Sequence, residues 1–569
     1  MDTQFDYIIV GGGAAGCVLA NRLSARSSNR VLLCEAGEDT PVGAVPEVIL
    51  DSFPGPAFLN PRFIWNELQV TTEAIPHNRP DVRPRRRVYE QARVLGGGSS
   101  INGQLLNRGA PGDYDEWEAR GATDWNWDAV LPYFRKVERD MDFSGPLHGD
   151  AGRIPVTRIF PDLWPQHAKG MSAALSRHGL PYIADQNGGF DDGHYPLAIS
   201  NYLDRRVSAA IGYLDPATRQ RANLTILTNT PVVRLLMDGP RCIGVAAMVQ
   251  DTEQNFHASE VIVSSGALHS PAHLLRAGIG PAAHLRDLGI DVITSLAGVG
   301  QGLMDHPSVA IAAFIKPHAR INGRTRRHLM MGVRFSSGLD GAAQGDMAAT
   351  ISTKSAWHAV GEQIATFNFW VNQTFSSAGE VRLTSTDWRA EPQVDFNLLA
   401  DRRDLDRLAG AIRLFAPIFA WPEVQAVVSD PFPASYSDKV RQIGAITTKN
   451  KMLTQVLAKL LDGPAALRSR LINSLIVEGA PLSVLMQDDV ALHGFVRHAA
   501  VGVWHCASSC RMGAADDPMA VTDSTGHVHG VAGLRVVDAS IFPRVPCANT
   551  NFPTLMAAEK ISDHILAGD

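Results

Sequence analysis

The sequence contains little cysteine and no long apolar run, and both absences restrict the kind of protein that it can encode. Its 569 residues include six scattered cysteines: Cys17, Cys34, Cys242, Cys506, Cys510 and Cys547. They have neither the density of a disulfide framework nor the paired CxxC spacing of a zinc site. No apolar stretch approaches the roughly 20 residues that a membrane-spanning helix needs. We therefore expect no disulfide scaffold, no bound metal and no membrane span.

A strong excess of charge is also absent. Lys and Arg together number 52, Asp and Glu number 58, and the formal net charge is -6. This balance gives no general electrostatic reason to bind nucleic acid or an anionic membrane. The first residues lack the cationic segment and the apolar core of a signal peptide, so we expect a cytoplasmic location. A chain of this length is expected to form two domains, because single hydrophobic cores stop growing at a smaller size.

A glycine-rich turn near the N-terminus carries the first functional signal. Phe5–Val10 has the pattern of a buried parallel strand, and Gly11, Gly13 and Gly16 follow it at GxGxxG spacing. An apolar helix is predicted over Cys17–Leu23. In this motif the glycines permit a tight turn, close approach of backbone to a pyrophosphate and close helix packing. The pattern predicts a dinucleotide site without separating FAD from NAD.

The next predicted strand ends in an acid. Arg30–Cys34 is followed by Glu35, which lies roughly 20 residues beyond the glycine motif. A carboxylate at this place accepts hydrogen bonds from ribose hydroxyls and repels a 2′-phosphate. Because strand, helix and acid occur together, a glycine turn without a ligand is the weaker interpretation.

A second glycine-rich segment is specific enough to indicate a family. Residues 93–107 are RVLGGGSSINGQLLN, with consecutive glycines between a strand-like start and an apolar continuation. Such a run lets backbone come close to another group. The segment resembles the first signature of the glucose-methanol-choline (GMC) oxidoreductase family, whose corresponding loop lies along the pyrophosphate and isoalloxazine of FAD.

Further motifs resemble the same family in the same order. GALHSPAHLLRAGIGP at 266–281 is similar to the second signature, and VGQGLMDHP at 299–307 to the element that follows it. LRVVDAS at 534–540 and NTNFPT at 549–554 are similar to the closing flavin-binding strand and helix start. YDEW and VDFNLL are similar to the bacterial branch that contains 5-hydroxymethylfurfural oxidase and related aryl-alcohol oxidases.

This resemblance implies FAD as the cofactor. Some family members attach FAD through a histidine in the first signature, but this chain has Ile101 there, so we expect non-covalent binding. Val232 falls where the family holds adenine with backbone atoms. The residues expected to bind the cofactor are Gly11, Gly13, Ala14, Ala15, Gly16, Glu35, Ala36, Arg93, Leu95, Gly97, Gly98, Ser99, Asn102, Gly103, Val232, Asp538, Ala539, Asn549, Asn551 and Thr554.

The resemblance also implies a catalytic pair. His505 matches the active-site histidine of the family, and Asn549 matches its partner position, which is histidine or asparagine in relatives. Histidine suits a base because its pKa of roughly 6.5 lies near the operating pH. We expect His505 to accept the hydroxyl proton and Asn549 to bind the substrate oxygen. Without the family, both would be interpreted as structural residues.

Other residues near this pair receive simpler interpretations. His269, His273 and His306 lie in cofactor-domain motifs, and we interpret them as structural. Ser508 and Ser509 replace the usual Gly-Thr of the family, which removes a glycine from the loop around the base.

The substrate pocket is expected to be aromatic. Trp504 stands beside the base, and Phe369 and Val371 belong to a strand-like run in the region that lines the substrate in relatives. An apolar pocket of this kind favours flat, apolar alcohols over sugars.

The separated flavin motifs imply a discontinuous FAD-binding domain. We expect an α/β, Rossmann-like domain from residues 1–155, 205–304 and 495–569. Residues 156–204 and 305–494 are expected to form an α+β substrate-binding domain with an antiparallel sheet over the flavin. The strands predicted for this sheet are Val309–Ile315, Glu380–Thr384 and Val394–Asn397, with a helix over Asp401–Phe415 outside them.

A leucine-rich stretch at 449–490 has no counterpart in the motifs above. Leu453, Val456, Leu457 and Leu460 give it an amphipathic helical pattern. We expect a packed helical hairpin, with a substrate-access lid or a dimer contact as the alternatives.

Together these features predict FAD-dependent oxidation of primary aromatic, furanic or heteroaryl alcohols to aldehydes. The hydride would pass to flavin N5, and O2 would accept the electrons and yield H2O2. A quinone-linked dehydrogenase of the choline dehydrogenase type would use the same site. FAD-containing hydroxynitrile lyases share the fold and the histidine base without net redox chemistry. The exact alcohol and the oligomeric state stay open.

Overall fold

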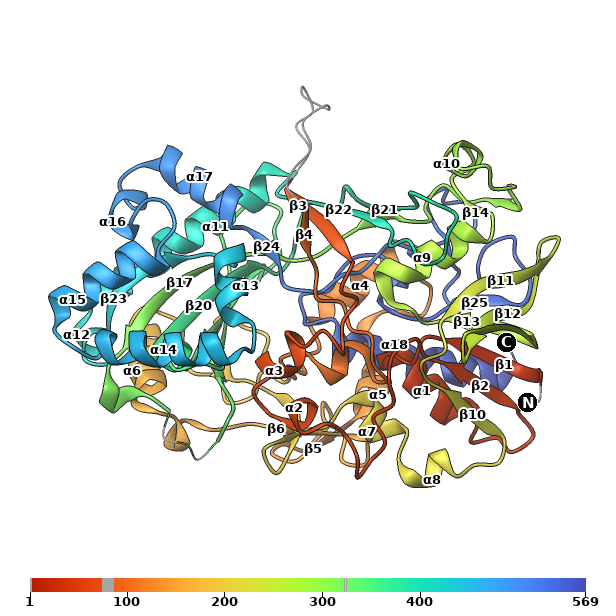
Figure 1. The fold of residues 1–569 in the computed structure, drawn as a ribbon, viewed down its shortest axis with the longest axis horizontal. Helices are drawn as coiled ribbons and strands as arrows, with labels where there is room; N and C mark the ends of the chain where they lie inside the picture. The colour runs from red at the N-terminus through yellow and green to blue at the C-terminus, as the bar shows by residue number, and fades with distance from the viewer. Residues whose placement is uncertain (1–2, 74–85, 322, 324, 569) are drawn as a thin grey trace.

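A computed structural model describes residues 3–73, 86–321, 323 and 325–568 of the chain. Two large sheets lie at opposite ends of the molecule (Figure 1). One contains β1 (Gln4–Val10), and the other contains β17 (Pro307–Ile315). Within the described residues, no helix combines the length and the apolar character that a membrane crossing requires.

The first sheet contains the nucleotide motif predicted from the sequence. β1 pairs in parallel with β2 and β13, and β2 pairs in parallel with β10. The strand order is β10 (Leu224–Leu227), β2 (Val31–Cys34), β1 (Gln4–Val10), β13 (Thr252–Val263), β12 (Arg241–Val249) and β11 (Val232–Asp238), with β25 (Leu534–Val536) beside β13. Ile8 and Ile9 are fully buried, as expected for a covered parallel strand.

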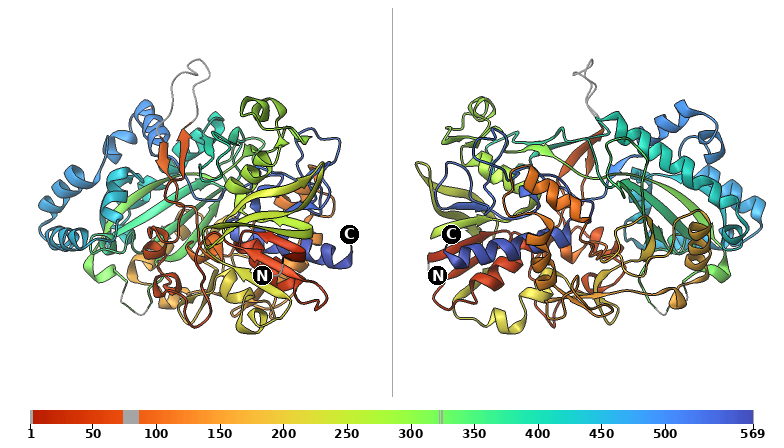
Figure 2. Two further views of the ribbon diagram at one scale, coloured as in Figure 1. Left: turned by 45° about the vertical axis from the view of Figure 1, so that its right-hand side comes forward. Right: turned by 180° about the vertical axis from the view of Figure 1, so that it is seen from behind.

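Helices from both ends of the chain cover this sheet. α1 (Ala14–Leu23) follows β1, and α18 (Asn551–Ala567) lies beside α1, as the red and blue helices of Figure 2 show. α1 begins three residues before the predicted helix. The sheet and these two helices therefore join segments from opposite ends of the chain.

The second large sheet is antiparallel. Its order is β23 (Val428–Ala434), β17 (Pro307–Ile315), β20 (Ile364–Val371), β19 (Met347–Ser352), β18 (Leu329–Phe335) and β7 (Gly193–Pro196), with β24 (Val501–Gly502) beside β17. α11 (Arg402–Phe415) covers one face, where Phe415 packs on Phe367 and Phe369. The Asp401 side chain caps this helix by accepting from the Arg403 N–H.

One prediction about this sheet is wrong. Of the three strands predicted to share it, only Val309–Ile315 does so, as part of β17. The other two form β21 and β22, which pair with each other in a separate sheet. That sheet has the order β16 (Gln301–Leu303), β21 (Gly379–Arg382), β22 (Gln393–Leu398), β3 (Gln69–Glu73) and β4 (Arg86–Val88). Alternation identifies a strand but does not identify its neighbours.

Shorter elements connect and flank these sheets. A small sheet has the order β5 (Glu138–Asp140), β6 (Ile154–Thr157), β8 (Ile199–Tyr202) and β9 (Arg205–Arg206). The other main helices are α4 (Pro111–Ala119), α5 (Trp127–Val137), α6 (Gln166–Arg177), α9 (Gly266–Arg276), α13 (Asp438–Gly444), α14 (Thr448–Leu461), α15 (Ala465–Leu471) and α17 (Asp489–Ala499).

The leucine-rich stretch is helical and packs by one face. α14 buries Thr454, Ala458 and Leu461 against a cluster that includes Phe314 and Ile364. Three of the four residues that suggested an amphipathic helix, Leu453, Val456 and Leu460, are instead exposed. The face that packs is therefore not the most apolar one.

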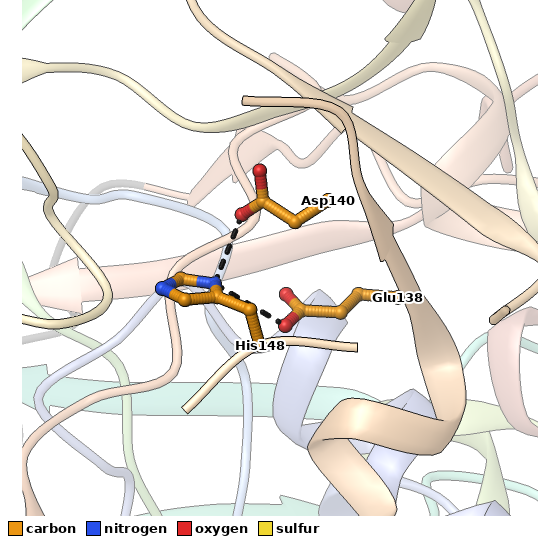
Figure 3. A group of neighbouring side chains, drawn as sticks. All are labelled: Glu138, Asp140 and His148. Carbon is orange, nitrogen blue, oxygen red and sulfur yellow. Dashed lines mark ion pairs between the residues drawn. The ribbon is translucent and has the colours of Figure 1, made fainter. Parts of the chain in front are cut away.

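A buried charged cluster lies beside β5. His148 Nδ1 is 3.0 Å from Asp140 Oδ2 and 3.5 Å from Glu138 Oε1 (Figure 3). Burial opposes a charge on His148, but hydrogen bonds to Asp140 and Asp185 raise its pKa to about 10. Arg158 pairs with Asp140, and Arg108 with Glu138. The contacts describe a network of ion pairs, because a protonated imidazole has no lone pair to offer a metal.

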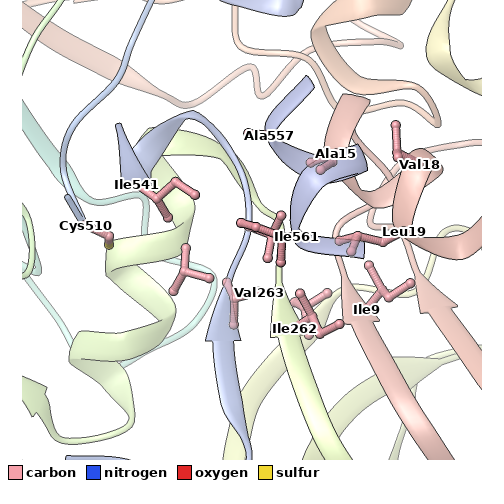
Figure 4. Close-up of a cluster of buried hydrophobic side chains, with 14 of the residues drawn as sticks. Ile9, Ala15, Val18, Leu19, Ile262, Val263, Cys510, Ile541, Ala557 and Ile561 are labelled. Carbon is pink, nitrogen blue, oxygen red and sulfur yellow. The ribbon is translucent and has the colours of Figure 1, made fainter. Parts of the chain in front are cut away.

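The main hydrophobic core joins residues that are distant in the sequence. Ile9 and Leu19 from the N-terminal part of the chain belong to the same buried cluster as Val263, Ile541 and Ile561 (Figure 4). The six cysteines are buried and not disulfide-bonded. This core holds the carboxyl end of β1 in a fixed place, which is where parallel sheets bind ligands.

Candidate active site

A cavity of about 890 Å³ opens at the carboxyl end of β1. Its walls also include Thr350 of β19 and Asn368 and Trp370 of β20, so both large sheets contribute to it. Most of the residues expected to bind a cofactor line it: Gly11, Gly13, Ala14, Ala15, Glu35, Ala36, Arg93, Gly97, Gly98, Ser99, Asn102, Gly103, Val232, Asp538, Ala539, Asn549, Asn551 and Thr554. The structure therefore gathers four segments that are distant in the sequence around one cavity.

Two predicted residues lie behind the cavity wall. A Cβ atom at Gly16 would collide with the Gly11 carbonyl oxygen, which explains why helix and strand need glycine there. Leu95 is fully buried, and its Cδ1 lies near Gly12. Both residues support the loops that face the cavity without lining it.

The two glycine-rich loops touch each other. A Cβ atom at Gly97 would lie 2.7 Å from the Gly13 Cα, and Gly97 itself has a φ of +54°. The Gly96 N–H donates to the Gly12 carbonyl over 2.7 Å. Both loops line the cavity with glycine backbone, which suits anion binding.

Glu35 is held by these loops. Its Oε2 accepts from the Gly12 N–H and its Oε1 from the Gly37 N–H, each over 2.7 Å. Burial raises the pKa of Glu35, although both N–H groups favour the ionised form. Each oxygen keeps a further lone pair, so the carboxylate can also accept from ribose hydroxyls.

The far wall is built by the C-terminal segment. Asp538 Oδ2 accepts from the Gly266 N–H over 2.8 Å and from the Ser270 hydroxyl over 2.5 Å. These bonds tie the last strand to α9. Asn551 and Thr554 line the cavity from the first turn of α18, so the positive end of this helix dipole lies at the wall.

His505 and Asn549 form a pair in the same cavity. Asn549 Nδ2 lies 2.8 Å from His505 Nε2, and both residues line the cavity. The Asn549 N–H donates to Asn107 Oδ1 over 3.0 Å, which fixes the backbone before α18. Asn549 Oδ1 is buried and has no hydrogen-bond partner among the described residues. The two side chains predicted to act together are therefore in contact.

His306 contacts His505, and the sequence did not predict this contact. Its Nδ1 lies 2.8 Å from His505 Nδ1, and the two rings are nearly perpendicular. We interpreted His306 as structural, because the motif shows its presence but not which side chain it contacts. Its position directly after Asp305, in the segment that resembles a family motif, was the available signal.

Asp305 holds the backbone of both histidines. Its Oδ1 accepts from the His306 N–H over 2.7 Å and from the His505 N–H over 3.0 Å. The Tyr89 hydroxyl donates to Oδ2 over 3.3 Å. Burial raises the pKa of Asp305 to about 7, against the effect of these N–H groups.

The environment keeps the base neutral. Burial, and next the charge of His306, lower the pKa of His505 well below its usual range. Burial also lowers the pKa of His306 to about 3. Strongly shifted pKa values inside a cavity are typical of functional sites. A neutral imidazole is the form that accepts a proton.

The loop around the base has an unusual backbone. Trp504 has a φ of +60° and Ser508 a φ of +76°, values that non-glycine residues rarely adopt. Ser508 therefore has a glycine-like backbone conformation, and it stands where the family usually has glycine. Trp504 lines the cavity as predicted and packs edge-on against Phe58 at 5.0 Å between ring centroids.

Two predicted pocket residues are placed differently. Phe369 and Val371 are fully buried in the core between β20 and α11, where Phe369 stacks on Phe415. Because side chains alternate along a strand, Asn368 and Trp370 face the cavity instead. The prediction that Phe369 and Val371 line the pocket is wrong by one residue of register.

The residues present fit FAD. Bare backbone at Gly13, Gly97 and Gly98 and the starts of α1 and α18 suit a pyrophosphate, and buried Glu35 suits a ribose. Next to them, a neutral imidazole and a carboxamide can accept and donate one hydrogen bond each to a small polar ligand. The arrangement can therefore take a proton from a hydroxyl beside a dinucleotide.

Comparison with known proteins identifies the family. The GMC oxidoreductase models match residues 5–308 and 375–558. The chain is 44% identical to 5-(hydroxymethyl)furfural oxidase of Methylovorus sp. (strain MP688), covering 99% of each protein. It is 32% identical to oxygen-dependent choline dehydrogenase of Ectopseudomonas mendocina (strain ymp), covering 99% of this chain and 94% of that one.

A solved structure has the same fold. Pyridoxine 4-oxidase of Mesorbium loti superposes with a TM-score of 0.80 at 24% identity, covering 99% of each chain. The two-domain architecture is therefore that of the relatives. The chain belongs to the GMC oxidoreductase family.

Proposed function

We propose that the chain oxidises primary aromatic, furanic or heteroaryl alcohols to aldehydes, with FAD as the hydride acceptor and O2 as the final acceptor that yields H2O2. The observation that carries this proposal is the 2.8 Å contact between His505 Nε2 and Asn549 Nδ2 in the wall of the dinucleotide cavity. The 44% identity to 5-(hydroxymethyl)furfural oxidase supports the choice of alcohol.

The residues of this chain would act as base and as oxygen-binding group. His505 accepts the hydroxyl proton at Nε2, which carries no proton in the neutral ring and whose lone pair the alcohol takes over from Asn549 Nδ2. Asn549 donates through Nδ2 to the substrate oxygen and so orients the alcohol. FAD, when bound, supplies the hydride acceptor at flavin N5. Once protonated, His505 also stabilises negative charge that develops on a neighbouring oxygen.

The cofactor would be held without a covalent bond. Gly13, Gly97 and Gly98 would face the pyrophosphate, Glu35 the ribose, and Val232 the adenine. The first signature has Ile101 rather than histidine, and the loop from Gly97 to Gly103 contains no nucleophilic imidazole. This composition supports non-covalent FAD.

We also propose the domain division expected from the motifs. Residues 1–155, 205–304 and 495–569 would form the FAD-binding domain, and the remaining segments the substrate-binding domain. Pairing of β7 with β18 supports assigning 156–204 to the second domain. Asn368 and Trp370 support a position of the antiparallel sheet over the flavin, because both line the cavity from β20.

The test is anaerobic mixing of the yellow protein with benzylic, furanic, heteroaryl and aliphatic alcohols while the flavin absorbance is followed. We expect one aromatic or furanic class of alcohol to abolish the flavin absorbance. Admitting air should then restore the absorbance and produce H2O2. Reduction that air does not reverse, but a quinone does, would assign a dehydrogenase. A flavin that no alcohol reduces would contradict alcohol oxidation and favour lyase chemistry.

A further inference from the structure

α14 presents an apolar stripe to solvent. Met452, Leu453, Val456 and Leu460 are each between 43% and 63% exposed. Their spacing places them on one side of the helix, opposite the buried residues Thr454 and Ala458. Soluble proteins rarely leave such a contiguous apolar stripe without a partner.

Cations flank this stripe. Lys449 precedes Leu453 by one helical turn, and Lys459 follows Val456 by three residues. Lys449 and Lys459 are exposed, and neither forms an ion pair within the described chain. Lys451 is exposed as well, but its spacing of three and seven residues from Thr454 and Ala458 places it on the other side of the helix. We call Lys449, Lys459 and the four apolar residues the α14 surface.

Helix stability accounts for Lys459, which lies in the last turn, but not for Lys449. α14 has no acid in its first turn, where Lys449 lies and where the helix dipole disfavours a cation. α15 continues the same composition with exposed Leu467 and Arg470. The stability of α14 therefore does not explain why Lys449 lies beside exposed apolar residues.

The charge of this region differs from that of the whole chain. The charged residues of 438–478 are seven cations, Lys439, Arg441, Lys449, Lys451, Lys459, Arg468 and Arg470, and three acids, Asp438, Asp462 and Glu478. The chain as a whole has a formal net charge of -6. This segment is therefore more cationic than the chain, and its helices α14 and α15 lie at the end opposite β1 and α18 (Figure 1).

We propose that the α14 surface docks on an anionic phospholipid bilayer. Apolar side chains flanked by lysines on one helix face are the composition that inserts at a lipid headgroup boundary. The lysines match the negative surface potential of such a bilayer. A second copy of the chain is the poorer partner, because a symmetric contact would place the same lysines against each other. The proposal does not depend on the reaction catalysed.

The experiment is flotation of the FAD-loaded full chain with vesicles of phosphatidylcholine alone or mixed equally with phosphatidylglycerol. Binding to the anionic vesicles only is expected. Replacing both lysines of this surface, K449E/K459E, should weaken this binding at least about 25-fold, since each lysine near an anionic surface adds about a factor of five. L453S/V456S/L460S should weaken it as well.

The matched control is Leu163→Ser, at an exposed leucine in another region, which should bind like the wild type. Flavin content and alcohol-dependent flavin reduction should be unchanged in all variants, because no residue of the α14 surface lines the cavity. Equal binding to neutral vesicles, or no binding to either kind, would overturn the proposal. So would a wild-type dimer that L453S/V456S/L460S dissociates without any vesicle binding.

Discussion

His306 and His505 share one hydrogen bond between their Nδ1 atoms, 2.8 Å apart. One arrangement of protons satisfies every contact of His505: its Nδ1–H donates to His306, and its Nε2 keeps the lone pair that accepts from Asn549. This tautomer is the one that a base acting through Nε2 requires. His306 thus fixes both the ring orientation and the position of the proton on His505.

Replacing His505 should remove the base and leave the cofactor bound. We expect His505→Ala to lower the rate constant of anaerobic flavin reduction by roughly 10² to 10⁴, the usual contribution of a general base. Stopped-flow absorbance measures this rate. The flavin content of the variant is the control, and reduction at the wild-type rate with full FAD would refute the assignment.

His306→Phe should act through His505. The variant keeps a ring of similar size but loses the Nδ1 acceptor, so His505 is no longer held in one tautomer. We expect reduction to slow by roughly 10 to 10²-fold, as for a misplaced catalytic group. A structural role alone would alter stability without altering this rate, so thermal unfolding should be measured on the same samples.

The pH dependence of reduction follows from the lowered pKa of His505. The base is active when neutral, so activity is lost only below its folded pKa, which burial holds well under 6.5. We expect the reduction rate at saturating alcohol to stay constant from about pH 6.5 to 8.5. Burial raises the pKa of Asp305 to about 7, so this carboxyl also changes its protonation within the range. Asp305→Asn removes that titration and leaves only the effect of His505. A loss of rate near pH 7 that persists in Asp305→Asn would contradict the prediction.

Ser508→Gly should stabilise the protein. Ser508 has a φ of +76°, and its buried hydroxyl has no hydrogen-bond partner among the described residues. Relief of the backbone strain outweighs the added freedom of glycine in the unfolded chain, by about 1 kcal/mol. Thermal unfolding of the FAD-loaded protein measures this gain. Ser509→Gly is the contrast, because it loses the bond from Ser509 Oγ to the Ala267 carbonyl and should destabilise.

Truncating two neighbouring residues of β20 should have different effects: Trp370 should affect catalysis, and Phe369 should affect stability. Trp370→Ala enlarges the cavity and should change KM and kcat for aromatic alcohols while the fold persists. Phe369→Ala leaves a hole beside Phe415 and should cost about 3–5 kcal/mol of stability. Steady-state kinetics and chemical unfolding distinguish the two. A Phe369→Ala variant of unchanged stability would contradict its placement in the core.

The nucleotide-binding half of the fold was predictable because its signals are local. The strand, turn, helix and acid from Phe5 to Glu35 follow one another in the sequence, and each imposes its own geometry on the next. The segment around Gly97 was identified through its resemblance to a family motif. Most of these residues line the cavity.

The substrate side was less predictable because its signals are not local. The choice between Phe369 and Trp370 depends on which face of β20 meets α11, and a one-residue slip reverses the answer. The sheet that contains β21 and β22 is likewise decided by pairing with β3, some 300 residues earlier in the chain. The motif that contains His306 was visible in the sequence, but its contact with His505 is visible only in the structure.

The contact between Gly13 and Gly97, and the wall completed by Asn551 and Thr554, have a consequence for how the protein matures. The ribosome synthesises the chain from its N-terminus, so the loop that contains Gly13 is made more than 500 residues before Asn551 and Thr554. The cavity therefore cannot be complete until the C-terminal segment has been synthesised. Loading of the flavin is accordingly one of the last events of biosynthesis, and partial translation products should emerge colourless.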